Sequence, residues 1–345
     1  AVNFLFRNGE LGVNFFFVLS GFLITYLLIQ EKEYTSDIHV PNFYVRRILR
    51  IWPLFYLCVL IGFGLWPLLK SFAGVSPAET SNPVFYLLLI NNFDYIHQQS
   101  VSDQLFPDAL ILIVLWSVAV EEQFYLSWPL LLKISPRKLY PLIFTGIILG
   151  TLLFRYFYAF SYHTDLHSRA VIKFHTLSVI GDMAVGALMA YFTASETRFL
   201  RFIRQMPRVG IFLLYFLVSV VFLFREEIFF SGPMIVVERL IIALLFGMVI
   251  MEQNFSENSF YKFSRFKKMS KLGNYTYGLY CYHFLVISLV NFAFIKLAGE
   301  TRNFGIAVFC SLVSLFCVIL ISKISYRYFE TPFLKLKNRF AFIVK

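Results

Sequence analysis

Long apolar runs alternate with short basic loops along the chain, and this pattern predicts helices that cross a membrane. About 20 apolar residues, each rising 1.5 Å, span the roughly 30 Å hydrocarbon core of a bilayer. We therefore predict an all-α, polytopic transmembrane helical bundle in a single membrane-embedded domain, residues 1–345. About nine spanning helices are expected, at 12–30, 51–69, 108–133, 139–158, 174–193, 209–225, 233–251, 274–296 and 304–324. The apolar stretch from Val84 to Phe93 is too short to span and is expected to be re-entrant or interfacial.

The third of these runs carries two carboxylates near its middle. Residues 110–132 read LILIVLWSVAVEEQFYLSWPLLL, with Glu121 and Glu122 side by side. A carboxylate at the middle of a span is costly unless it faces a polar interior. Adjacent helical residues point about 100° apart, so we expect one Glu to face the bundle centre and the other a neighbouring helix. A structural ion pair or a hydrogen-bonded acid is the alternative to a functional role.

The composition supports a membrane protein. The chain is 59% hydrophobic and only 15% charged, whereas a soluble domain has about 25% charged residues. Its four cysteines lie in apolar runs without a CxxC pair, which argues against a disulfide framework or a zinc site.

The net charge of +11 follows from the loops rather than from nucleic-acid binding. Loops 31–50, 133–138, 196–208, 252–273 and 323–345 lie on one side and hold 22 of the 31 Lys and Arg residues. The positive-inside rule places these loops, and the C-terminus, in the cytoplasm. The first residue then lies outside, so we expect that an N-terminal helix precedes this sequence and that the complete bundle has ten helices.

Polar residues occur at similar depth in several of the predicted helices. Ser20, next to Gly21, and Asp182 each lie eight residues from an outer helix end, or roughly 12 Å deep. His283 lies near mid-bilayer, where an intramembrane histidine is a candidate for proton transfer. Helix packing for Ser20, ion pairing for Asp182 and a tyrosine hydrogen bond for His283 are the structural alternatives. Together with Glu121 they suggest a polar chamber inside the bundle.

Two arginines at the cytoplasmic edge of the second helix form a candidate phosphate site. Arg47 and Arg50 are three residues apart and share a helix face, an arrangement suited to bidentate contact with phosphate. Ordinary positive-inside anchoring explains the same residues without a ligand.

Histidines in an outer loop give a weaker signal. His163 and His167 have a spacing that can hold a metal on a helix, and His175 follows, but no acidic motif accompanies them. We predict no metal site.

Five segments together resemble bacterial integral-membrane acyltransferase family 3. They lie between Gly12 and Leu334 and read GVNFFFVLSGFLI, FYVRRILRIWPLFY, LWSVAVEEQFYLSWPLLL, TYGLYCYHFLVI and SYRYFETPFL. The resemblance implies a ten-helix bundle in the bacterial cytoplasmic membrane that transfers an acyl group, usually acetyl from acetyl-CoA, to a hydroxyl of a cell-envelope or exported carbohydrate.

The resemblance also suggests roles for individual residues. Its Arg-x-x-Arg element falls on Arg47 and Arg50, implying acyl-CoA binding. Its next element falls on Trp116, Ser117 and Glu121, which favours Glu121 over Glu122, and its Tyr-x-x-His element falls on Tyr280 and His283. We assign candidate catalytic roles to Glu121 and His283. The candidate substrate-binding residues are Ser20, Trp116, Tyr280 and Asp182.

The family's first helix has no counterpart here. That helix carries an arginine and, about ten residues on, the histidine regarded as the catalytic base. It matches the span that the topology count expects upstream.

The expected function is an O-acyltransferase with acyl-CoA as co-substrate, no bound cofactor, a glycan or glycolipid acceptor, and no nucleic-acid partner. A transporter or flippase for a lipid-linked glycan or an acyl carrier is the alternative, because polar residues near the midplane also suit a transporter. Against it, the sequence has no visible inverted repeat.

The topology can be tested with reporter fusions. A reporter fused after Lys345 should be cytoplasmic and one inserted near His163 external, because the basic loops lie inside. The reverse accessibility of these two points would contradict the predicted orientation.

Overall fold

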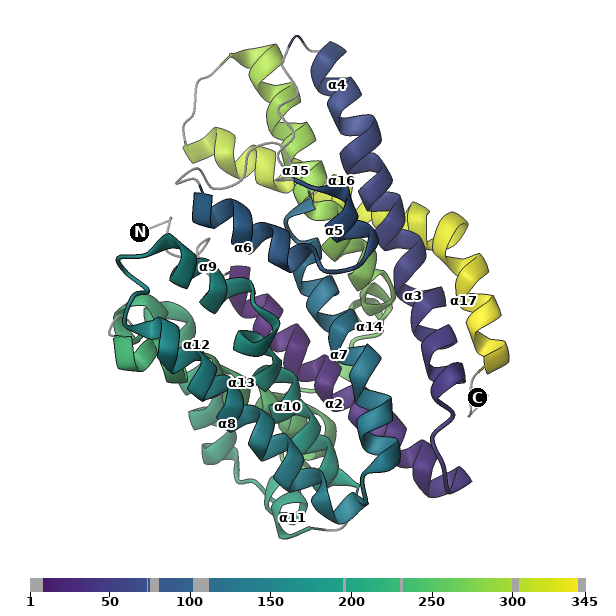
Figure 1. Ribbon diagram of the computed structural model, residues 1–345, viewed down its shortest axis with the longest axis vertical. Coiled ribbons are helices and arrows are strands. Elements are labelled where there is room, and N and C mark those ends of the chain that lie inside the picture. The colour runs from purple at the N-terminus through teal and green to yellow at the C-terminus, as the bar shows by residue number, and fades with distance from the viewer. Residues whose placement is uncertain are drawn as a thin grey trace. The chain divides into compact units, whose positions relative to one another are not determined.

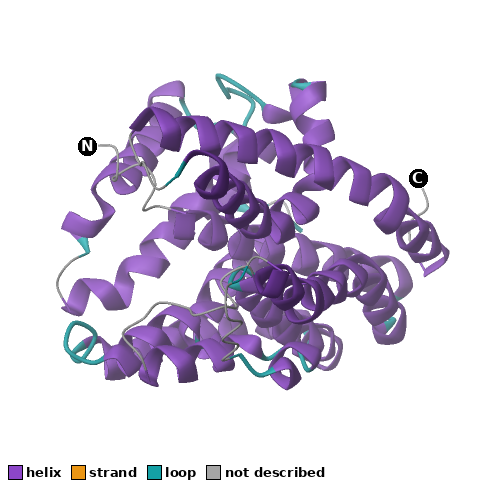
Figure 2. Ribbon diagram, turned by 90° about the horizontal axis from the view of Figure 1, so that it is seen from above, coloured by secondary structure: helices purple, strands orange, loops and turns teal. Residues whose placement is uncertain are grey.

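The computed structural model describes residues 9–72, 74, 81–101, 112–194, 197–229, 232–299 and 304–340. This part of the chain is mainly helical and contains no strand, which confirms the all-α prediction (Figure 2). Eight of its helical segments are long and apolar enough to cross a membrane. They are Gly9–Thr35, Val40–Phe72, Arg137–Ala159, Leu166–Thr193, Arg208–Ile228, Pro233–Phe255, Lys267–Leu297 and Phe304–Phe340. The chain is thus a multi-pass membrane protein.

Nine spanning helices were predicted, and one of them has no counterpart among the eight apolar segments of the described residues. The run predicted at 108–133 lies outside the described residues at 108–111, and its described part contains α7 (Leu115–Ile134). Helix α7 is not among the eight apolar segments. Its consecutive polar residues Glu121, Glu122 and Gln123 lower its hydropathy. The short run at 84–93 forms α5 (Pro83–Leu87) and the start of α6 (Asn91–Val101).

The chain divides into two compact units, each built from two segments. The first contains residues 1–40 and 120–263 and the second residues 41–119 and 264–345, so the division falls inside α7. The single domain predicted for residues 1–345 stays a prediction.

The first unit contains the larger part of α7 and seven further helices (Figure 1). They are α2 (Gly9–Thr35), α8 (Tyr140–Ala159), α9 (Leu166–Phe174), α10 (Thr176–Thr193), α11 (Arg198–Arg204), α12 (Arg208–Ile228) and α13 (Gly232–Phe255). Polar caps define several of their starts: Asp165 for α9, His175 for α10 and Thr197 for α11 accept backbone N–H groups.

The second unit contains α3 (Val40–Leu60), α4, α5, α6, α14, α15 (Thr276–Ala298), α16 (Phe304–Ser325) and α17 (Thr331–Lys337). Helices α4 and α14 cover Trp66–Phe72 and Lys267–Leu272. Single π-helical turns, Ile61–Leu65 and Tyr326–Glu330, join α3 to α4 and α16 to α17. Such turns often lie at functional sites.

Helices α2 and α10 approach each other backbone to backbone. A Cβ atom added to Gly21 would lie 2.0 Å from the carbonyl oxygen of Met183, and one added to Gly186 would lie 2.0 Å from that of Val18. Only glycine fits at either position. Small residues at helix interfaces allow this close packing in membranes, where lipid supplies no hydrophobic driving force.

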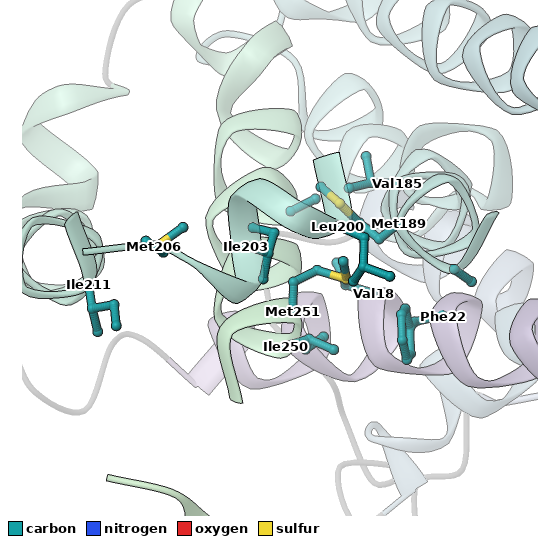
Figure 3. Packing of buried hydrophobic residues seen from close by; sticks show 12 residues of the cluster. Val18, Phe22, Val185, Met189, Leu200, Ile203, Met206, Ile211, Ile250 and Met251 are labelled. Atoms are coloured by element: carbon teal, nitrogen blue, oxygen red, sulfur yellow. The ribbon is translucent and has the colours of Figure 1, made fainter. Parts of the chain in front are cut away.

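A cluster of buried hydrophobic side chains continues this contact toward α11 and α13 (Figure 3). Val18 and Phe22 from α2 meet Val185 from α10 and Met251 from α13. Ile203 from α11 is fully buried in the same cluster. The short helix α11 is therefore part of the core of the first unit.

Polar contacts tie the end of α7 to α2. Lys32 Nζ donates to the carbonyl oxygens of Leu132 (2.7 Å) and Ser135 (3.0 Å), at the C-terminal end of α7. A cation is favourable there because it satisfies carbonyls that lack helical partners. Trp128 Nε1 donates to Thr25 Oγ1 at 2.8 Å, and both residues are buried.

The close contact of α2 with α10 predicts that Gly186 tolerates no side chain. Gly186→Ala places a methyl group against the Val18 carbonyl, so α2 and α10 must separate, at a cost of about 1–3 kcal/mol or more. We expect the apparent Tm in detergent to fall by several degrees. Gly146→Ala on α8 is the control, since nothing lies within 4 Å of its added Cβ. Equal Tm values for the two variants would contradict the close contact.

Candidate functional site

A closed set of hydrogen bonds joins Glu121 to Ser20 and Tyr125 in the first unit. Ser20 Oγ donates to Glu121 Oε1 at 2.6 Å and lies 2.6 Å from Tyr125 Oη. Tyr125 Oη donates to the same carboxylate oxygen. Glu121 is 4% exposed, so its carboxylate is removed from solvent and held by hydroxyl groups. The structure thus brings together two of the predicted site residues, Ser20 and Glu121.

Tyr125 was missed by the sequence analysis. It lies four residues after Glu121, which places both side chains on one face of α7. The same spacing, applied to a buried carboxylate that needs a donor, would have identified Tyr125. Glu122 is half-buried, as expected for a neighbour that points in another direction.

Asp182 has a different set of partners. It accepts hydrogen bonds from Asn14 Nδ2, at 3.2 Å, and from the Arg239 guanidinium, with which it forms an ion pair. Asp182 and Asn14 are 2% and 1% exposed, so this contact joins α2, α10 and α13 deep inside the unit. Asp182 was predicted from the sequence, whereas its partners Asn14 and Arg239 were not.

Further ion pairs lie on neighbouring helices. Arg225 contacts both Glu238 (2.6 Å) and Glu10 (3.3 Å), and Lys173 also contacts Glu10 at 2.5 Å. Arg155, 1% exposed, lies 3.8 Å from Glu238. The exposed fraction of these side chains ranges from 42% at Glu10 to 1% at Arg155, so a charged network runs from the surface into the unit.

Arg155 is held mainly by backbone carbonyl groups. Its guanidinium donates to the carbonyl oxygens of Val236, Ile235 and Ile172, and to Ser178 Oγ. A buried arginine needs such a set of acceptors because its charge and its five donors have left water.

In the second unit, Tyr280 contacts the segment that carries Trp116 and Ser117. Tyr280 Oη donates to the Val114 carbonyl oxygen at 2.9 Å and lies 2.5 Å from Ser117 Oγ. Trp116 is 7% exposed. These three predicted residues therefore lie in one region.

His283 lies one helical turn from Tyr280 on α15. Its Nδ1 lies 2.6 Å from the Tyr280 carbonyl oxygen. Because a carbonyl can only accept, Nδ1 carries the proton in the neutral ring and Nε2 becomes the acceptor. Nε2 is therefore the nitrogen of His283 that can accept a proton.

The two predicted phosphate-binding arginines lie on α3. The Arg47 guanidinium lies over the Phe43 ring, 5.5 Å from its centroid, and Arg50 is exposed. Arg46, beside them, donates to the Phe340 carbonyl oxygen at 2.9 Å. Arg50 lies within electrostatic range of Glu330 and Lys337, in the segment that ends the second unit.

The histidines considered for a metal have other contacts. His175 accepts from the Leu177 N–H and stacks on Phe154 at 4.7 Å, and His167 meets the Tyr158 ring.

Comparison with known proteins identifies the family. Residues 1–323 match the family model described as an acyltransferase domain. The chain is 28% identical to O-acetyltransferase OatA of Staphylococcus aureus strain NCTC 8325 / PS 47 over 359 residues, covering 98% of this chain and 55% of that protein. OatA of strain MRSA252 gives the same values. The chain spans about half the length of the curated relatives it matches. No solved structure matches it.

The motifs of α2, α3, α7 and α15 lie in the region that the family model covers. The chain therefore belongs to acyltransferase family 3.

Proposed function

We propose that this protein transfers an acyl group, most simply acetyl, from acyl-CoA to a hydroxyl of a cell-envelope or exported carbohydrate. The observation that carries the proposal is the buried Glu121 carboxylate, held by Ser20 and Tyr125 within a motif of the acyltransferase domain. The name of the matched relatives, O-acetyltransferase, supports acetyl transfer to oxygen. The proposed location is the bacterial cytoplasmic membrane, with the C-terminus inside.

The proposed reaction needs a base and a site for the donor. The acceptor oxygen attacks the thioester carbonyl, the carbon–sulfur bond breaks, and the hydroxyl proton ends on the CoA thiolate. Glu121 is the candidate base or the carboxylate that supports one, because Ser20 and Tyr125 present exchangeable protons beside it. His283, with Nε2 as acceptor, is the second candidate.

The donor site is proposed at Arg47 and Arg50, whose forked guanidinium groups suit the CoA phosphates. Trp116, Tyr280, Ser20 and Asp182 remain the candidate substrate contacts. No resident cofactor takes part in this scheme.

Labelled acetyl-CoA tests the function directly. Membranes that contain the full-length protein should transfer label to an isolated carbohydrate acceptor. If the acceptor crosses the membrane unlabelled instead, the protein is a transporter rather than a transferase.

Removal of either arginine should weaken donor binding. Arg47→Ala and Arg50→Ala should each raise the Kd for acetyl-CoA about 10- to 150-fold, because a charge-assisted hydrogen bond contributes roughly 1.5–3 kcal/mol. The affinity should be measured on purified protein, with Arg208→Ala, an exposed arginine of the first unit, as control. Unchanged affinity in both variants would leave the pair as membrane anchors.

Neutralising Glu121 should affect turnover rather than donor affinity. Glu121→Gln keeps the shape but removes the carboxylate, so kcat should fall about 10²- to 10⁴-fold. Tyr125→Phe removes one donor to this carboxylate and should have a smaller effect. Glu122→Gln is the matched control on the next residue and should retain most activity. A similar loss in the Glu121 and Glu122 variants would contradict the assignment.

A further inference from the structure

A small cavity in the first unit is lined by both residues of the Asp182–Arg239 ion pair, and Glu121 is not part of its lining. It has a volume of about 10 Å³ and is lined by α8, α10 and α13. Its polar lining consists of Thr151, Arg155, Asp182 and Arg239, and Gly181 also borders it. Aliphatic side chains complete the wall.

Two buried polar atoms of this lining have no hydrogen-bond partner among the described residues. They are Thr151 Oγ1 and Arg239 Nε. Thr151 is 7% exposed, so solvent does not satisfy its hydroxyl. Almost all buried donors and acceptors in native proteins are satisfied, and ordered water does this where protein groups do not.

The neighbouring charges are already committed to other partners. Arg155 donates to three backbone carbonyls and to Ser178, and Asp182 accepts from Asn14 and Arg239. Gly181 limits the space from the other side, since a Cβ added there would lie 3.1 Å from Thr151 Oγ1. Thr151 Oγ1 and Arg239 Nε therefore belong to residues that line the cavity, and both atoms are without a hydrogen-bond partner among the described residues.

We propose that this cavity binds one water molecule that accepts a hydrogen bond from Arg239 Nε and shares another with Thr151 Oγ1. The guest must accept, because Nε can only donate, which excludes a metal cation. The Asp182 carboxylate in the lining disfavours an anion. A volume of about 10 Å³ is enough for one water molecule.

The water gives α8 a polar link to α13. Thr151 lies on α8 and Arg239 on α13, and Arg239 in turn holds Asp182 on α10. The bound water therefore fixes the guanidinium on the side that Asp182 does not reach. Asp182 then positions Arg239, which binds the water, in addition to any contact that Asp182 makes with substrate.

The change in Tm caused by Thr151→Val distinguishes a hydrated cavity from a dry one, because the two cases predict changes in opposite directions. With water bound, Thr151→Val removes one partner of the water, and Tm should fall by about 2–4 °C. In a dry cavity the same change replaces an unsatisfied hydroxyl by a methyl group, and Tm should rise. A rise would overturn the proposal.

Thr25→Val calibrates the measurement. Thr25 is buried and accepts a hydrogen bond from Trp128, so its loss gives the cost of removing a satisfied threonine in the same unit. We expect a fall in Tm for both valine variants.

A density map of the unsubstituted protein provides the second test. At a resolution that reveals ordered waters, a peak should lie within hydrogen-bonding distance of both Thr151 Oγ1 and Arg239 Nε. Absence of a peak, in a map that contains other buried waters, would overturn the proposal even if the valine variants do not fold.

Discussion

The backbone contact between α2 and α10 is the constraint on which the first unit depends. Because Gly21 and Gly186 lack side chains, the two helices approach until a backbone carbonyl of each meets a glycine of the other. Ser20 and Asn14 lie on α2, and Asp182 lies on α10. A single close contact thus fixes the helices that carry three polar residues of the core.

The position of Glu121 requires a second contact, between α2 and α7. Lys32 satisfies the terminal carbonyls of α7, and Trp128 is bonded to Thr25. These contacts lie about two to four helical turns from Glu121 and hold α7 against α2. A change at Lys32 would therefore reach the Ser20–Glu121 hydrogen bond without touching either residue.

The sequence was informative where a physical signal is local. Apolar run length predicted the eight spanning segments, because hydropathy depends on neighbouring residues only. The second begins at Val40, earlier than the predicted start at 51. The polar group at 121–123 lowers the hydropathy of α7, so α7 is not among the eight apolar segments of the described residues. The family resemblance, carried by five short motifs, is confirmed by the match over residues 1–323.

Partners from distant helices could not be read in the same way. Arg239 is 57 residues from Asp182, and Asn14 is 168 residues away. Hydropathy gives no information on which helices face each other, so the sequence named the costly carboxylate but not the groups that satisfy it. Tyr125 differs, because a four-residue spacing on one helix places it beside Glu121.

The two buried carboxylates are satisfied in different ways, and this difference bears on their chemistry. Asp182 pairs with a guanidinium, and an arginine keeps its charge under all physiological conditions. The loss of the Asp182 carboxylate would therefore leave the buried Arg239 guanidinium without this ion-pair partner. Glu121 is held at Oε1 by the hydroxyls of Ser20 and Tyr125, which can both donate and accept. Glu121 therefore has hydroxyl partners rather than a fixed cation, and this difference supports the proposal that Glu121, rather than Asp182, acts in acyl transfer.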